Sequence, residues 1–279
     1  KAFFMFAIDT YAVLGNPVAH SKSPPIYLSF AQAAGYEINY LKLFVPTGEF
    51  ASTVDKFRAL GAKGINITLP CKGDAYHYAT VRSEAAEISQ ASNCLKFTAD
   101  GVVHAENFDG VGLIRDIVHN HHTPLTGKRV LILGAGGATR GLLMPLQAEQ
   151  PASITVCNRD QSRLMALHEL LKNKVAFDSC DYPHLKGEYD VVMNATSASL
   201  SQVALPLPDK LFAKDALAYE LVYGKGLTPF LKQAQAQGVK RVADGVGMLA
   251  EQAAEAFHFW YGQRPPTQEV IRMLTVPLR

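Results

Sequence analysis

One stretch decides the fold: Val130-Leu131-Ile132-Leu133-Gly134-Ala135-Gly136-Gly137-Ala138-Thr139-Arg140-Gly141. Its apolar start is typical of a buried strand, and its glycines lead into a helical pattern. Gly134 permits a tight turn, Gly136 lets the main chain approach a pyrophosphate, and the following helix offers unpaired N–H groups to the anion. Thr139 stands where the strict glycine motif has its last glycine. The stretch therefore predicts a dinucleotide site at Gly134, Ala135, Gly136, Gly137 and Ala138, with a purely structural turn as the alternative.

The kind of dinucleotide is indicated about one βαβ spacing later. The strand expected over Ile154–Cys157 ends in Asn158-Arg159, where an NAD-selective site commonly carries an acidic residue. An arginine there can pair with the 2′-phosphate of NADP in a bidentate contact, and Arg163 lies one helical turn further on. Asp160 would repel that phosphate or compensate Arg159 by ion pairing. The pattern favours NADP, with a solvated Arg/Asp surface as the alternative reading.

Outward from this stretch, short apolar runs alternate with amphipathic segments, which is typical of βαβ units around parallel sheets. Strands are predicted in two series, and a hairpin closes the first: Tyr11–Leu14, Ile38–Val45, Gly64–Thr68, then Cys94–Phe97 with Val102–Ala105; after these, Arg129–Leu133, Ile154–Cys157, Val191–Asn194 and Leu217–Glu220. A helix is expected to begin near Pro24, with Ser23 as its cap and Gly35 as its stop. The polar segment His119–Gly127 predicts a linker between two α/β domains.

Composition limits the classes of partner. The 279 residues are 48% hydrophobic, and 27 Lys plus Arg against 25 Asp plus Glu leave a net charge of +2. This balance provides no broad attraction to nucleic acid or to an anionic membrane. Four widely spaced cysteines without a CxxC pair favour reduced thiols, and the apolar opening Lys1–Ile8 is far shorter than the roughly 20 residues of a membrane helix. We expect a cytoplasmic monomer or homodimer that binds a small molecule, without nucleic-acid or membrane partners.

Five further stretches occur in a specific order along the chain: Gly15-Asn16-Pro17-Val18-Ala19-His20-Ser21-Lys22-Ser23-Pro24, the segment Gly64–Lys72, Asn107-Phe108-Asp109-Gly110, Asn194-Ala195-Thr196-Ser197, and the segment Asp244–Ala254. Together with the glycine stretch, this set resembles the shikimate dehydrogenase family over nearly the whole chain. The resemblance implies a substrate-binding and catalytic domain over 1–109 and a Rossmann-like NADP domain over 110–245. It also implies C-terminal helices over 246–279 that return to the first domain.

The resemblance places catalysis at Lys72 and Asp109. Reduction of a ketone requires a hydride, which nicotinamide supplies, and a proton, which a positioned ammonium can donate to the developing alkoxide. Asp109 would hold Lys72 and a substrate hydroxyl in one hydrogen-bonded arrangement. Taken singly, a loop lysine is more often solvated and an aspartate before glycine more often a turn. The implied reaction is the reversible NADPH-dependent reduction of 3-dehydroshikimate to shikimate in chorismate biosynthesis.

Matched family positions imply the remaining contacts. The substrate carboxylate would accept hydrogen bonds from Ser21, Ser23 and Tyr223, and the ring hydroxyls would contact Asn66, Thr68, Asn93 and Gln252. Further cofactor contacts are implied at Thr196, Gly245 and Met248, beside those at Asn158, Arg159 and Arg163. No metal is implied, and the polar segment with His119, His121 and His122 lacks a convincing fourth ligand.

Several residues depart from the family pattern, and each change alters a polar contact or space near the implied site: Phe108 and Cys94 for threonine, Asp160 for threonine, Glu220 for aspartate and Ser199 for glycine. If Phe108 points toward substrate, it takes space and removes a donor. Two alternatives therefore stay open. One is a quinate/shikimate dehydrogenase that uses NAD, and the other is a catalytically silent shikimate-binding sensor.

Overall fold

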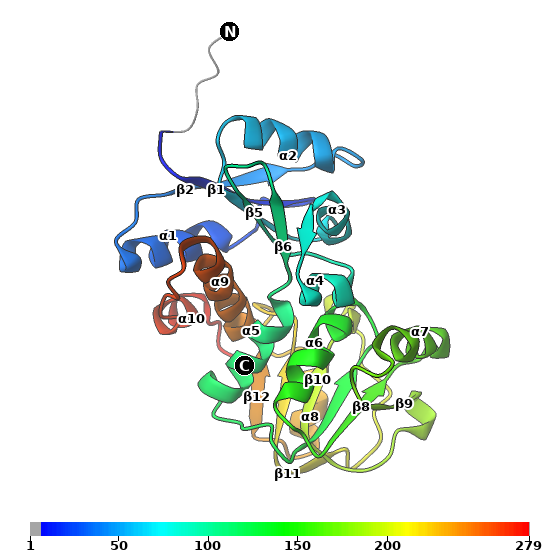
Figure 1. Cartoon of the computed structure of the whole chain (residues 1–279). Helices are drawn as coiled ribbons and strands as arrows, with labels where there is room; N and C mark the ends of the chain where they lie inside the picture. The colour runs from blue at the N-terminus through cyan, green and yellow to red at the C-terminus, as the bar shows by residue number, and fades with distance from the viewer. Residues whose placement is uncertain (1–6, 279) are drawn as a thin grey trace. The chain divides into compact units, whose positions relative to one another are not determined.

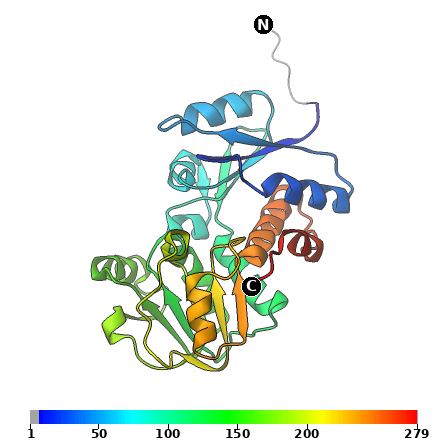
Figure 2. The ribbon, with the colours of Figure 1, turned by 180° about the vertical axis from the view of Figure 1, so that it is seen from behind.

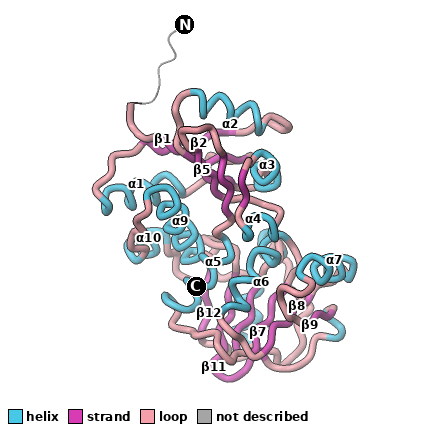
Figure 3. The backbone as a smooth tube through the Cα atoms, viewed as in Figure 1, coloured by secondary structure: helices cyan, strands magenta, loops and turns pink. Residues whose placement is uncertain are grey.

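The computed structural model describes residues 7–278, and most of the apolar opening Lys1–Ile8 lies outside this part of the chain. The described chain divides into two compact units. The first contains the residues up to Asp109 together with Ala250–Val270, and the second contains Gly110–Leu249 together with the residues from Ile271. Each unit is built on one six-stranded sheet (Figure 3).

The sheet of the first unit has the strand order β2-β1-β3-β5-β6-β4. Its strands are β1 (Thr10–Gly15), β2 (Asn39–Phe44), β3 (Gly64–Ile67), β4 (Val81–Arg82), β5 (Cys94–Phe97) and β6 (Val103–Glu106). The first three are parallel, and β5 runs antiparallel to both β3 and β6. The predicted hairpin and the three predicted early strands are therefore present.

The two faces of this sheet are covered differently, because successive side chains of a strand point to opposite sides. Ala12 and Leu14 join a buried apolar cluster with helix α2 (Phe50–Ala59) and helix α3 (Lys72–Tyr78). Tyr11, between them in sequence, stacks on Trp260 with ring centroids 4.3 Å apart. The second face is therefore aromatic and carries part of helix α9 (Val246–Tyr261).

Helix α1 (Ser23–Ala34) corrects one expectation about its start. Ser23 is the first helical residue rather than the cap, Lys22 occupies the cap position, and no side chain caps the helix. The Ser21 hydroxyl accepts from the Ser23 backbone N–H at 3.2 Å, so the serine two positions earlier binds the helix start. Pro24 inside the first turn and the left-handed Gly35 at the end agree with the prediction.

The second sheet has the order β12-β11-β10-β7-β8-β9, and all its neighbouring strands are parallel. Its strands are β7 (Arg129–Leu133), β8 (Ser153–Cys157), β9 (Asp178–Cys180), β10 (Tyr189–Asn194), β11 (Phe212–Glu220) and β12 (Arg241–Asp244). Helices α6 (Gly137–Ala148) and α7 (Gln161–Leu171) lie on one face (Figure 1), and α8 (Pro229–Ala236) covers the other (Figure 2). This is a doubly wound Rossmann-like unit, whose strand order reverses at β7.

The remaining helices are α4 (Glu84–Ser89), α5 (Asp109–Arg115), α10 (Gln268–Leu274), the π-helix Asp116–Asn120 and the short 3-10 turns Tyr182–His184 and Ala198–Ser201. Among the described residues, none of the helices combines the length and the apolar character needed to cross a membrane.

The polar segment His119–Gly127 is not a linker between units, because it lies inside the second unit. Thr123 is buried, and its hydroxyl accepts from the Arg241 guanidinium at 2.5 Å. His121 Nε2 lies 3.4 Å from the buried Asp116 carboxylate. Polar composition suggested a solvated connection, but Thr123 binds a residue 118 positions away and His121 lies against a buried carboxylate.

Candidate active site

Lys72 and Asp109 lie together in the first unit. Lys72 begins α3 and Asp109 begins α5, so each side chain is held at the first turn of a helix. Lys72 Nζ donates to Asp109 Oδ2 at 2.5 Å. The two side chains are 25% and 20% exposed, which leaves the pair reachable from solvent but partly shielded. An ammonium held by a carboxylate in this way can deliver a proton to an oxygen that binds beside it.

Asn93 connects this pair to helix α9. Its Nδ2 group donates to Asp109 Oδ1 at 2.8 Å and to Gln252 Oε1 at 3.2 Å, while its Oδ1 accepts from the Phe108 backbone N–H at 3.0 Å. Both amide hydrogens of Asn93 are therefore engaged by the protein itself. Asn93 is placed to orient Asp109 and Gln252, in addition to the substrate contact that the family resemblance implies.

Two further pairs of predicted residues are hydrogen-bonded, and one of them also binds Tyr40, which the sequence did not single out. Ser21 Oγ donates to Ser23 Oγ at 3.2 Å. Tyr40 Oη donates to Asn66 Oδ1 at 2.6 Å, and Asn66 Nδ2 donates to the Asn93 carbonyl oxygen at 3.4 Å. Nothing in the alternation of β2 distinguishes Tyr40 from an ordinary inward-facing tyrosine, so no local signal was available for it.

Thr68 follows β3, and its backbone N–H donates to the Leu14 carbonyl at 2.9 Å. This brings the threonine against Gly15, where an added Cβ would lie 2.4 Å from Thr68 Cγ2 and 3.2 Å from the Leu69 carbonyl oxygen. Gly15 is required for this approach of two loops. The half-buried Thr68 thus belongs to the same strand ends as Asn66.

The Phe108 side chain packs against another aromatic residue of the first unit. Its ring packs edge-on against Phe259 of α9, with centroids 5.9 Å apart, and the side chain is half-buried. Cys94 is fully buried at the start of β5. Much of the Phe108 ring is therefore used in packing the first unit, which limits the space that it can take from a ligand.

The glycine stretch of the second unit forms the predicted strand-to-helix turn. Gly134 has φ +106°, and an added Cβ there would lie 3.1 Å from Thr196 Cγ2. Thr139 is buried and its hydroxyl donates to the Gly134 carbonyl at 2.8 Å, so the threonine closes the turn from the helix side. An added Cβ at Gly136 or Gly137 would meet nothing within 4 Å, and no side chain caps α6. The open turn and the free first-turn N–H groups fit a pyrophosphate.

In the segment after β8, Asp160 caps helix α7 and lies against Arg163. Asp160 Oδ1 caps α7 by accepting from the Ser162 backbone N–H at 2.9 Å, and Oδ2 lies 3.6 Å from Arg163 Nε. The hydrogen bond from the Ser162 side chain lowers the pKa of Asp160, so the carboxylate is charged. Arg159 is exposed and forms no ion pair with any described residue. Asp160 is thus compensated by Arg163, and Arg159 is left available for an anion.

Two departures from the family pattern bind each other. Glu220, fully buried at the end of β11, accepts at Oε2 from the hydroxyls of Ser199 and Thr228 at 2.5 and 3.0 Å and from Asn194 Nδ2 at 2.9 Å. Burial raises the pKa of Glu220. Asn194 Oδ1 in turn accepts from the Thr196 hydroxyl at 2.7 Å. The longer acid and the added serine therefore form one network that holds the predicted cofactor residue Thr196.

Gly245 and Met248 follow β12, at the same strand-end edge as the glycine turn. Gly245 has no room for a side chain, because an added Cβ would lie 2.2 Å from the Leu221 carbonyl oxygen. Gly247 is equally confined by the Asp116 carboxylate, which accepts from Tyr219 Oη at 2.6 Å. Tyr223 lies in the loop after β11 and is exposed. These residues belong to the second unit, whereas Lys72, Asp109 and the other predicted substrate contacts belong to the first.

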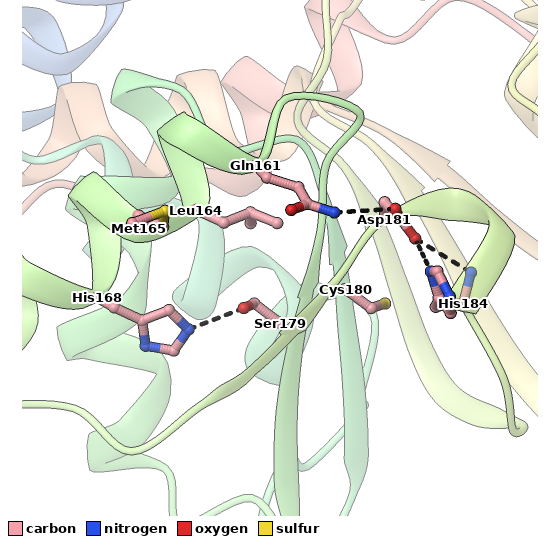
Figure 4. Close-up of a pocket in the computed structure, with 8 residues that line it drawn as sticks. All are labelled: Gln161, Leu164, Met165, His168, Ser179, Cys180, Asp181 and His184. Atoms are coloured by element: carbon pink, nitrogen blue, oxygen red, sulfur yellow. Dashed lines mark hydrogen bonds and ion pairs between the residues drawn. The ribbon is translucent and has the colours of Figure 1, made fainter.

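A separate pocket of about 310 Å³ lies between α7 and β9 (Figure 4). Its polar groups bind one another: Asp181 accepts from Gln161 Nε2 at 3.2 Å and contacts His184 Nδ1 at 2.5 Å, while His168 contacts Ser179 at 2.8 Å. None of the predicted site residues lines it. Among residues 7–278, no group of three or more His, Cys, Asp or Glu side chains is arranged to hold a metal ion.

Three family models match the chain in order. They are the shikimate dehydrogenase substrate binding domain over 13–95, shikimate / quinate 5-dehydrogenase over 116–204, and the shikimate 5′-dehydrogenase C-terminal domain over 245–274. A Chromobacterium violaceum protein named shikimate dehydrogenase (NADP(+)) is 49% identical over 95% of this chain and 97% of its own. A protein of the same name from Aromatoleum aromaticum is 46% identical over 96% and 97%.

Solved structures are similar over the same length. The Ael1 enzyme from Pseudomonas putida has a TM-score of 0.94 and 49% identity, covering 97% of this chain and 100% of that one. The Thermus thermophilus shikimate 5-dehydrogenase, solved with NADP(H) and shikimate, has a TM-score of 0.84 and 30% identity over 96% and 100%. With family models along its length and relatives this similar, the chain belongs to the shikimate dehydrogenase family.

Proposed function

We propose that this chain is an NADP-dependent shikimate dehydrogenase, an oxidoreductase that reversibly reduces 3-dehydroshikimate to shikimate in chorismate and aromatic amino-acid biosynthesis. The observation that carries the proposal is the ion pair of Lys72 and Asp109, joined to Gln252 through Asn93. The names of the relatives support the reaction, and the Thermus thermophilus structure supports the pair of ligands.

In the proposed mechanism, the hydride for the ketone carbon would come from NADPH when it is bound at the glycine turn. Lys72 Nζ gives its proton to the carbonyl oxygen as negative charge develops there, and takes it back in the oxidative direction. Asp109 holds Lys72 and one substrate hydroxyl, while Asn93 keeps Asp109 from rotating. Because the protein already forms these hydrogen bonds, little reorganisation is needed when substrate binds.

Substrate contacts are proposed for seven polar side chains. Ser21, Ser23 and Tyr223 would donate to the carboxylate, and the ring hydroxyls would contact Asn66, Thr68, Asn93 and Gln252. A site that hydrogen-bonds each hydroxyl discriminates against analogues that lack one, because buried polar groups are then left unpaired.

The proposed cofactor contacts follow the geometry of the second unit. The turn from Gly134 to Ala138 would bind the pyrophosphate, with the α6 N-terminus oriented toward it. Arg159, together with Asn158 and Arg163, would contact the adenosine ribose and its 2′-phosphate. Thr196, Gly245 and Met248 would contact the rest of the dinucleotide. We further propose a cytoplasmic monomer or homodimer that acts without nucleic-acid or membrane partners.

The test is NADPH formation from shikimate, followed by absorbance, with quinate and NAD as matched replacements. Rapid turnover only with shikimate and NADP supports the proposal. A preference for quinate and NAD would instead identify a quinate/shikimate dehydrogenase. Saturable shikimate binding without turnover would identify a sensor, and either of these results would overturn the proposed activity.

A further inference from the structure

The first unit contains two stacked tyrosines that the proposed mechanism does not use. The rings of Tyr27 and Tyr40 are stacked, with centroids 4.6 Å apart and an angle of 5° between the ring planes. Both side chains are buried on the aromatic face of the first sheet. Only Tyr40 has a side-chain hydrogen bond, 2.6 Å to Asn66 Oδ1; Tyr27 Oη has no hydrogen-bond partner among the described residues.

The strand register explains how Tyr40 reaches Asn66. β1 lies between β2 and β3, and it pairs Tyr11 with Tyr40 on one side and Val13 with Asn66 on the other. Tyr11 and Val13 point to the same face because they are two residues apart. Tyr40 and Asn66 therefore share that face, and the tyrosine spans the central strand beneath the strand ends that carry the predicted substrate contacts.

The direction of this hydrogen bond determines what Asn66 can offer to a ligand. A phenol has one proton, so its donation to Asn66 requires the amide oxygen to face Tyr40 and the amide nitrogen to face away. Asn66 Nδ2 has two hydrogens, and the Asn93 carbonyl accepts one at 3.4 Å. Burial raises the pKa of Tyr40 well above its usual value, so the phenol stays protonated, although the Ser23 side chain opposes part of the rise.

We propose that Tyr40 is a positioning residue of this site: it fixes the Asn66 amide so that one N–H faces the substrate and selects a ring hydroxyl oxygen as its acceptor. The inference rests on the proposed function, because it takes the ligand to be a polyhydroxylated carboxylate. Without the Tyr40 hydroxyl, the amide can rotate by half a turn and present its oxygen in place of its nitrogen.

Tyr27 provides a matched control. Tyr27→Phe and Tyr40→Phe each remove one buried hydroxyl and keep the stacked rings. Loss of an unpaired hydroxyl should leave stability unchanged or improve it, whereas loss of a paired hydroxyl leaves the Asn66 oxygen unsatisfied. A general effect of altering this aromatic face would appear in both variants.

The experiment measures KM for shikimate and for NADP, kcat, and binding of shikimate and its monodeoxy analogues by calorimetry. For Tyr40→Phe we expect KM for shikimate to rise about tenfold, with KM for NADP and kcat within about threefold of the wild type. For Tyr27→Phe all constants should stay within about twofold. The wild type and Tyr27→Phe should bind shikimate more tightly than the monodeoxy analogue that lacks the hydroxyl facing Asn66. Tyr40→Phe should bind shikimate and this analogue with equal affinity.

Equal KM values for Tyr40→Phe and the wild type would overturn the inference. So would a uniform loss of affinity for shikimate and every analogue, since that pattern indicates general distortion. Failure of the proposed function is seen separately, in the wild type. If the wild type binds shikimate without oxidising it, the proposed dehydrogenase activity is refuted, and the binding comparison between variants can still be made. If the wild type neither binds nor oxidises shikimate, both the proposed activity and the proposed role of Tyr40 are refuted.

Discussion

Replacing Lys72 with methionine tests the proposed proton donor. Methionine keeps most of the length and apolar volume of the lysine and removes only the ammonium. In the wild type this ammonium is 2.5 Å from Asp109 Oδ2, and Asp109 also accepts from Asn93. The variant therefore keeps an oriented Asp109 and loses only the cation.

The expected magnitude follows from the separate roles of the ammonium. A positioned general acid contributes about 100- to 10,000-fold to the rate, which is about 2.7 to 5.5 kcal/mol of the barrier. The stability effect should be smaller. The side chains are 25% and 20% exposed, so solvent screens the pair, and its loss should cost less than about 1 kcal/mol. A fall in kcat of at least about 100-fold should thus accompany a nearly unchanged melting temperature.

The assay is steady-state NADPH formation from shikimate, together with a fluorescence titration of NADPH binding and a thermal melt. Lys63→Met is the matched control, because Lys63 lies in the same unit and its ammonium makes, among residues 7–278, only an exposed 4.0 Å contact with Asp9. Cofactor affinity should be retained in both variants. If Lys72→Met turned over shikimate within about threefold of the wild type, the acid/base assignment would be refuted.

Three further changes test the second unit. Arg159→Ala should weaken NADP binding by about tenfold or more and leave NAD binding unchanged, as the 2′-phosphate loses a charge-assisted contact; equal losses in fluorescence titrations would contradict this. Glu220→Gln should be compared with the wild type by denaturant unfolding from pH 7.5 to 5. Burial raises the pKa of the Glu220 carboxyl in the folded state, so protonation favours folding and the wild type should gain stability relative to the variant as the pH falls. A stability difference that does not change with pH would refute this. Gly247→Ala should lower the melting temperature, because the new Cβ would lie within 2.4 Å of the buried Asp116 carboxylate, and overpacking costs about 1–3 kcal/mol; a higher melting temperature from improved helix propensity would show that the carboxylate can move.

Local patterns predicted much of the fold because they depend on nearby residues. The strand Arg129–Leu133 was predicted with the bounds that the structure gives it, since an apolar run that ends at glycines has few alternatives. Strand β11 begins at Phe212, five residues before the predicted Leu217, because the exposed charged residues Lys214 and Asp215 interrupt the apolar run. Ser23 was taken for a cap, yet the chain enters the helix earlier and Ser21 binds that turn.

Short ordered motifs were enough to identify the family, the doubly wound nucleotide unit and the positions of the proposed acid/base pair. Which buried polar side chains form hydrogen bonds with one another became clear only from the tertiary structure. Tyr40 binds Asn66 across a strand, and Ser199 binds Glu220 from another loop. Buried polar groups require partners, but the partner is chosen by sheet register and strand ends rather than by sequence distance. The polar segment around Thr123 was likewise predicted to be a linker, but it belongs to the second unit, where Thr123 binds Arg241.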